Sequence, residues 1–385
     1  MSGESNAELY HQHNSFASIN ELGASAGCNY STDICIRPCY YALQVLGMWT
    51  PYVQNDSTVK EVLYKIYYVF IRFIWLISLV AVMSLDFVHY GFKEKEVHFA
   101  DLMNSVPTCL NLLCPFVFTK IYLKRGQFTK LVTSVQNVSL QYQTRLRKRA
   151  QFYTWLSVTL WLLSATFFVF HWKPFFSRIW HYVVYTIVMV YTTGWWAVWL
   201  SIYAFVCHVH CLQIDVLIDS IRSKEATAVQ VLYKQQHLRN SLERTQKDFN
   251  SIISFAISYH ALDIIIFSFA YYDSAFGKNY ELWQYAGGVA FDLVTILIKL
   301  FPPALVAAAV HHSVSEAAKR CDVTPLMEKM PDEDMRLFQY MTSCEHDMGL
   351  KILGIRITVE LVGTILMTIV TAAVSFVAFV VPRLE

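Results

Sequence analysis

The hydrophobic pattern of the chain is dominated by long apolar segments separated by polar connections. Seven such segments cover roughly residues 60–85, 99–121, 150–170, 179–207, 250–271, 282–310 and 352–381. Each is long enough to cross a bilayer, because about 20 helical residues span the hydrocarbon core. The segments do not alternate between apolar and polar residues, which favours helices over barrel strands. We therefore predict an all-α membrane protein with seven transmembrane helices.

Positive charge is distributed unevenly between the connections. The second, fourth and sixth connections hold 18 Lys and Arg residues, whereas the other connections and the C-terminal tail hold six. By the positive-inside rule the basic connections are cytoplasmic, which places the N-terminus inside the cell and the C-terminus outside. A G-protein-coupled receptor has the opposite orientation.

The composition agrees with a membrane protein. Only 16% of the residues are charged and 55% are hydrophobic, whereas soluble domains carry about 25% charged residues. We expect a multi-pass protein of the plasma membrane, with the lipid bilayer as a partner and no nucleic acid.

The polar connections predict helices below the membrane. Residues 1–35 are rich in Ser, Asn and Gly and lack periodicity, which predicts a disordered cytoplasmic tail. The cytoplasmic connections 208–250 and 311–350 carry apolar residues at helical spacing, so we expect a helical bundle continuous with the spans. The membrane parts are then 36–207 with four spans, 251–310 with two, and 351–385 with the last.

The last span carries a polar stripe. At 100° per residue, five polar residues fall within an arc of roughly 80°: Glu360, Thr364, Thr368, Thr371 and Ser375. Hydroxyls can replace part of an ion's hydration shell, and a carboxylate at the cytoplasmic end favours cations. Small polar residues also let helices pack closely, so the pattern alone leaves pore lining and helix packing open.

Other ionisable residues lie within the spans. Asp292 and Lys299 share a face of the sixth span, and Asp263 lies in the outer half of the fifth. Charges in a bilayer are unfavourable, so these residues either pair inside the bundle or contact a ligand or ion.

A cluster of metal-ligating residue types follows the fourth span: Cys207, His208, His210 and Cys211. A metal site needs further ligands, and the sequence offers no second cluster. We expect these residues to end a buried helix, and we predict no metal and no cofactor.

Aromatic residues crowd the third and fourth spans. They fill the core of a bundle or line a pocket for a small, mostly apolar organic molecule. The middle and outer parts of the spans contribute six candidate ligand contacts: Asn104, Thr108, Trp161, Phe168, Tyr185 and Asp292.

The architecture and two short motifs resemble the insect chemoreceptor superfamily of gustatory and odorant receptors. The gustatory signature is Thr-Tyr, five apolar residues and Gln-Phe. The matching stretch here keeps Thr371 and Phe379, with Ala372 and Ala378 in place of Tyr and Gln. The segment from Leu43 to Pro51 is similar to the Leu-Gly-Leu-Trp-Pro opening of many odorant receptors. The two motifs point to different branches, so they do not decide between a gustatory and an odorant receptor.

The resemblance implies a ligand-gated, non-selective cation channel, assembled as a homo- or hetero-tetramer whose last spans line a central pore. Carried over by position, Thr368, Thr371 and Ser375 would face the pore, and Ser375, Ala378 and Phe379 would form its outer constriction. The methyl group of Ala378 replaces a hydrogen-bonding amide, so gating there would proceed by dewetting.

Two alternatives remain besides the channel. A G-protein-coupled receptor is one, and a secondary transporter using Asp263, Asp292 and Lys299 as a relay is the other. The sequence has no His box, Ser/His/Asp set or Gly-rich phosphate loop, so we do not expect an enzyme.

Overall fold

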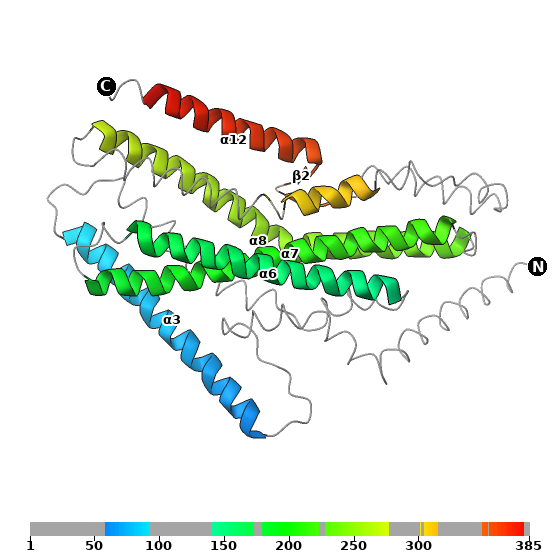
Figure 1. Cartoon of the computed structure of the whole chain (residues 1–385), viewed down its shortest axis with the longest axis horizontal. Helices are drawn as coiled ribbons and strands as arrows, with labels where there is room; N and C mark the ends of the chain where they lie inside the picture. Colours follow the sequence, from blue (N-terminus) through cyan, green and yellow to red (C-terminus); the bar gives the residue numbers. More distant parts are fainter. Residues whose placement is uncertain are drawn as a thin grey trace, which may run out of the picture.

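The chain is almost entirely helical in the part that the computed structural model describes, residues 58–92, 140–172, 179–222, 228–276, 301, 304–314, 349–352 and 354–380. Its long helices are α3 (Thr58–Phe92), α6 (Leu140–Trp172), α7 (Ile179–Arg222), α8 (Ala228–Phe276) and α12 (Val359–Val380). A short helix spans Ala304–Val314. An antiparallel hairpin of β1 (Lys351–Ile352) and β2 (Ile355–Arg356) precedes α12. Figure 1 shows α3 crossing the α6–α7 pair at an angle and α12 at the opposite edge.

Helices α7 and α8 are longer than the apolar segments that predict them. α7 begins at Ile179, as predicted, but continues beyond residue 207 to Arg222, and α8 begins at Ala228, well before residue 250. The extensions stay helical because their apolar residues are buried in two cores: Leu212 and Val216 in the core shared with α6, and Ile214, Leu238 and Leu242 in the core shared by α7 and α8. Each membrane-length segment and its polar continuation therefore form a single helix.

The predicted start of the last helix, near residue 352, is wrong. Residues 351–356 form the β hairpin, in which Ile352 pairs with Ile355 across a two-residue turn. Gly354 in this turn has φ +80°, a conformation that glycine adopts without the steric clash of a Cβ atom. The helix begins only at Val359.

Several predictions fall outside the described residues: the tail 1–35, the span 99–121, and most of the segments 282–310 and 311–350. Within the part of the chain that the structure describes, Tyr182–Asp219 is the one stretch long and apolar enough to cross a membrane. The number of spans and the sides on which the termini lie stay predictions.

One hydrophobic core lies between α6 and α7. The buried face of α6 recurs every three or four residues at Tyr142, Leu146, Ala150 and Tyr153. It packs against a run of α7 that is buried on all sides, Trp195 to Cys207. A helix that is buried all round is a central one, so α7 forms the middle of the described fold.

A second core joins α7, α8, the short helix and the start of α12. Tyr203 of α7, Leu242 of α8 and Val310 of the short helix are all buried there, together with Ile357 and Val362 beside the last helix. The helices that continue below the apolar segments and the base of α12 thus share one packed core.

A buried histidine ties α7 to α8 within this region. The His210 Nε2 and Thr245 Oγ1 atoms are 2.8 Å apart, and Nδ1 lies 2.9 Å from Gln213 Oε1. Because Oε1 can only accept, Nδ1 donates, and Nε2 then accepts from the Thr245 hydroxyl. Burial lowers the pKa of His210 to about 4, so the neutral ring is the stable form at neutral pH.

Candidate functional site: the exposed face of α12

The site begins with a firm connection between the hairpin and α12. The Ile357 amide donates to the Leu350 carbonyl over 2.9 Å and so extends the pairing of the hairpin. Thr358 then caps the helix, because its Oγ1 accepts a 3.1 Å hydrogen bond from the Leu361 amide. A side-chain oxygen at this position satisfies one of the amides that a helix start leaves unpaired.

Gln246 of α8 fixes the hairpin to the rest of the fold. Its Oε1 accepts from the Lys351 amide at 2.6 Å, and its Nε2 donates to the Lys351 carbonyl. Nε2 also donates to Asn250 Oδ1 over 3.1 Å. The side-chain amide thereby pairs with the edge of β1 as a neighbouring strand would, across 105 residues of sequence.

The packing of α12 changes abruptly after its first turn. Leu350, Ile357 and Val362 are 5% exposed or less. From Gly363 onward the described side chains are exposed or half-buried. Among the apolar ones, Ile365 is 50% exposed and Met367 64% exposed. The helix is therefore held at its base, while its remaining length presents a free surface in the single chain.

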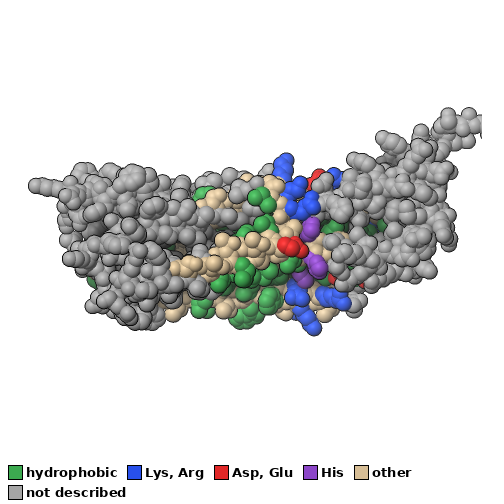
Figure 2. All heavy atoms as spheres, turned by 90° about the horizontal axis from the view of Figure 1, so that it is seen from above, with side chains coloured by type: hydrophobic (Ala, Val, Ile, Leu, Met, Phe, Trp, Pro, Cys, Tyr) green, Lys and Arg blue, Asp and Glu red, His purple; other side chains and the backbone are tan. Residues whose placement is uncertain are grey.

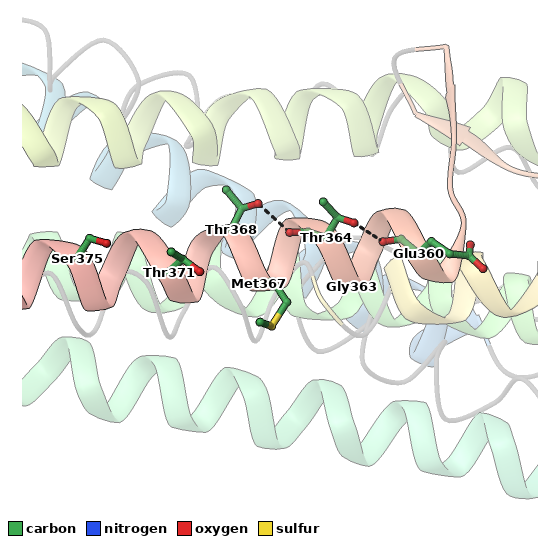
Figure 3. Close-up of a pocket in the computed structure, with 7 residues that line it drawn as sticks. All are labelled: Glu360, Gly363, Thr364, Met367, Thr368, Thr371 and Ser375. Atoms are coloured by element: carbon green, nitrogen blue, oxygen red, sulfur yellow. Dashed lines mark hydrogen bonds between the residues drawn. The ribbon is translucent and has the colours of Figure 1, made fainter.

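The five polar residues predicted from the sequence lie along this free surface. An open groove runs beside α12, and the residues that line it all come from this helix: Glu360, Gly363, Thr364, Met367, Thr368, Thr371 and Ser375. Figure 3 shows the carboxylate and the hydroxyls spaced along the helix. Among the described residues no other element lines the groove, which is therefore open on the side away from α12.

Two hydroxyls of the stripe bond to their own helix. Thr364 Oγ1 donates to the Glu360 carbonyl and Thr368 Oγ1 to the Thr364 carbonyl, each over 2.8 Å (Figure 3). A hydroxyl has one donor and two acceptor lone pairs. With the donor used internally, the oxygen presents its lone pairs to the groove, where they suit water or a cation.

The base of the stripe lies in a charged setting. Glu360 is exposed, and His311 and His312 of the short helix lie near enough to interact with it electrostatically. Figure 2, which views the side of the molecule on which α12 lies, shows basic, acidic and histidine side chains gathered beside an apolar stretch. On this side of the molecule, charged side chains therefore border apolar surface.

The remaining predicted pore residues, Ala378 and Phe379, lie on α12, but their side chains are outside the described part. Their role in a constriction stays a prediction.

Of the six predicted ligand contacts, Trp161 is the one whose side chain the structure describes. Trp161 of α6 is half-buried and donates from Nε1 to the Val190 carbonyl over 2.7 Å. A Cβ atom on Gly194 would lie 2.6 Å from that Nε1, so Trp161 holds α6 closely against α7. Phe168 and Tyr185 lie on α6 and α7 with side chains outside the description, and Asn104, Thr108 and Asp292 fall outside the described residues.

The cluster that follows the fourth apolar segment is a packing element. Both ring nitrogens of His210 have protein partners, and Cys207 and Cys211 are free thiols. Within the described residues no group of three or more His, Cys, Asp or Glu side chains could hold a metal ion.

The roles of Gln246 and Gly194 could not be predicted from the sequence. A polar residue on a long amphipathic helix and a glycine in an aromatic run carry no signal of a partner far away in the sequence. Thr358 could have been found, because a threonine just before an apolar helical run is a typical cap.

Comparisons with known proteins give likeness in structure alone. No protein-family model matches the sequence, and no curated protein matches it. The fold is similar to the structure of the insect olfactory receptor OR5 from Machilis hrabei, with a TM-score of 0.65 and 9% sequence identity over 89% of this chain and 97% of that one. The same receptor in complex with eugenol gives a TM-score of 0.65 and 10% identity over 90% and 97% of the two chains. The resemblance to insect chemoreceptors is thus confirmed at the level of the fold.

Proposed function

We propose that this chain, which has the fold of an insect olfactory receptor, is a chemosensory receptor that acts as a ligand-gated, non-selective cation channel. A small organic odorant or tastant would open it. The orientation we propose is that predicted from the charge distribution, with the N-terminus in the cytoplasm and the stripe of α12 leading outward from its inner mouth.

The observation that carries this proposal is the free polar face of α12. Glu360, Thr364 and Thr368 are exposed along an open groove. Exposed apolar residues flank the stripe, with Ile365 on one side and Val370, 44% exposed, on the other. Such flanks fit contacts with neighbouring copies or lipid, while the polar face borders a shared water column. Four copies around an axis, as the family resemblance implies, would enclose it.

The contacts at the base of α12 support a gating mechanism. The hairpin and the first turn of α12 are fixed to α8 through Gln246 and the shared core, and beyond Gly363 the helix is free. A ligand that binds better when the outer part of α12 is displaced would shift the population toward an open pore. Glu360 at the inner end would raise the local cation concentration.

The ligand class is proposed from two supports. The similar receptor from Machilis hrabei was solved in complex with eugenol, a small organic molecule. The aromatic third and fourth segments of this chain suit a ligand of that kind. Asn104, Thr108, Trp161, Phe168, Tyr185 and Asp292 remain the proposed contacts.

Cysteine accessibility tests the proposal directly. The chain is expressed alone in an otherwise silent cell, and currents are recorded with a panel of sugars, bitter compounds and volatiles. In Thr368→Cys and Thr371→Cys, a charged thiol reagent applied during stimulation should block the current. Ile365→Cys, off the stripe on the same helix, is the matched control and should respond as the parent chain does.

Three results would contradict the channel. Cysteines on the stripe that never react would remove the pore assignment. Saturable uptake without unitary currents would favour a transporter. An N-terminal tag found outside the cell would restore the orientation of a G-protein-coupled receptor.

A further inference from the structure

The start of α6 carries a dense basic surface. Four of five consecutive positions, Arg145 to Arg149, are basic, and all four basic side chains are exposed. Arg145 lies over the ring of Tyr142, 5.8 Å from its centroid. Within the described part of the chain, Arg147, Lys148 and Arg149 form no ion pair or hydrogen bond. Arg149 lies near enough to Tyr153 and His208 to act on them electrostatically. Among the described residues, Arg147 and Lys148 have no protein partner for their charge.

Two large aromatic side chains continue this surface along the helix. Trp155 is 70% exposed and Phe152 52% exposed. Lys148 and Trp155 are seven residues apart, which places them about 20° apart around the axis and about 10 Å apart along it. Both lie opposite the face that packs against α7 at Leu146 and Tyr153. Lys148, Phe152 and Trp155 therefore share the outward side of α6, and Arg147 and Arg149 lie about 100° to either side of Lys148.

We propose that this basic–aromatic face of α6 (Arg147, Lys148, Arg149, Phe152 and Trp155) binds the headgroups of anionic phospholipids in the cytoplasmic leaflet. The inference rests on the proposed membrane insertion and orientation. Helical side chains lean toward the N-terminus, so the cations extend toward the cytoplasmic side of the apolar segment. Trp155 then lies at the level where indole rings favour the membrane interface.

The chemistry of the surface suits an amphiphile better than a soluble anion. Guanidinium groups bind phosphate oxygens in a planar, two-pronged geometry, and Lys148 adds a point charge between them. A soluble phosphate or an acidic protein would use these cations but not the aromatic rings that continue into the apolar segment. A phospholipid uses both, because its acyl chains lie beside Phe152 and Trp155.

Native mass spectrometry of the full chain tests this binding without recording a current. The purified protein in detergent is incubated with equal amounts of phosphatidylserine and phosphatidylcholine, and the bound lipids are counted. We expect an excess of phosphatidylserine. The variant Arg147→Gln/Lys148→Gln/Arg149→Gln should lower the ratio of the two bound lipids by roughly tenfold or more, since each basic residue near a membrane contributes roughly fivefold.

Two matched variants separate lipid binding from a general loss of charge. Lys234→Gln/Arg239→Gln/Arg244→Gln removes three cations from the part of α8 that precedes its predicted span, and it should keep the lipid ratio of the parent chain. Arg147→Lys/Arg149→Lys retains the charge but not the two-pronged geometry, so it should lower the ratio less than the triple Gln variant does. A loss in the α8 variant, or a loss in the Lys variant as large as in the triple Gln variant, would overturn the proposal, as would a parent chain without preference for phosphatidylserine.

A headgroup without acyl chains distinguishes a lipid from a soluble anion. Glycerophosphoserine at the same concentration should leave the bound phosphatidylserine in place, and its displacement of the lipid would overturn the assignment. These readouts are independent of ligand and current. Failure of the channel proposal and failure of the lipid site would therefore be seen separately.

Discussion

The side-chain amide of Gln246 pairs with both the amide and the carbonyl of Lys351, and so holds the base of the last helix against α8. Polar side chains that bond to backbone groups far away in the sequence fix one geometry, because each lost partner leaves a polar atom unpaired. Gln246 thus fixes the position of α12 relative to α8 together with the core that the two helices share.

Replacement of Gln246 by Ala should destabilise the protein and alter gating. Three hydrogen bonds are lost, two to Lys351 and one to Asn250, so we expect the free energy of unfolding to fall by about 1–3 kcal/mol. Thermal unfolding in detergent measures this, and the ligand concentration for half-maximal current measures the effect on gating. Gln246→Glu keeps the acceptor for the Lys351 amide, so its stability and its gating should lie between those of the parent chain and of Gln246→Ala. Glu243→Ala, on an exposed position of the same helix, should change neither value.

A side chain at Gly194 should separate α6 from α7. The Cβ atom of an alanine would lie 2.6 Å from the indole nitrogen of Trp161, and overpacking of this kind costs about 1–3 kcal/mol. Gly194→Ala should therefore lower the unfolding temperature. If the clash is the cause, Trp161→Leu in the same chain should recover part of the loss, and purely additive effects in this double-mutant cycle would contradict it.

Stability should depend on pH through His210. Burial lowers its pKa to about 4 in the folded chain, against about 6.5 when unfolded. The unfolded state therefore binds more protons than the folded state between these pH values. The contribution of neutral, buried His210 to the free energy of unfolding is fully present above about pH 6.5 and is lost as the pH falls toward 4. This contribution amounts to up to about 3 kcal/mol.

Unfolding temperatures measured between these pH values in parent and His210→Gln check the assignment, and the variant should show a shallower dependence. Burial also lowers the pKa of His208 to about 4, with Arg149 adding to the effect. Because His208 remains, the unfolding temperature of His210→Gln should still depend on pH, but less steeply than that of the parent chain.

Removal of the cap on α12 should weaken its first turn. Thr358→Ala deletes the acceptor for the Leu361 amide, which costs about 1 kcal/mol. Thr358→Ser retains the oxygen and should behave as the parent chain does. Hydrogen exchange of the Leu361 amide measures the effect locally, and equal protection in both variants would show that the cap is dispensable.

Neutralisation of Glu360 should change permeation without changing the fold. Its side chain is exposed at the start of the polar stripe, so Glu360→Gln should leave the unfolding temperature unchanged. In the proposed channel the loss of its charge should reduce the single-channel conductance for cations, and more so at low salt, where screening is weak. Glu243→Gln on α8 is the control, and equal conductances in the two variants would remove Glu360 from the inner mouth.

The sequence was informative where a pattern is local. Hydropathy located α3, α6 and the start of α7, because an apolar stretch of membrane length has few alternatives to a helix. The 100° periodicity of α12 placed Glu360 and Thr368 on one face, and both are exposed along the same groove. Such properties follow from neighbouring residues alone.

Contacts between distant residues could not be predicted in this way. The pairing of Gln246 with Lys351 and of Tyr142 with Asp219 depends on how long helices meet. The hairpin before α12 was hidden because its isoleucines continue an apolar run, although Gly354 and Thr358 mark a turn and a cap. A polar residue reveals its partner only once the packing is known.

The uninterrupted course of α7 has a mechanical consequence. At 1.5 Å per residue, its 44 residues make a rod about 66 Å long, roughly twice the thickness of a hydrocarbon core. A stiff rod acts as a lever, so a tilt of about 5° at one end moves the other by about 6 Å. Repacking of aromatic side chains near Ile179 would therefore displace the helix sideways near Arg222, at its opposite end.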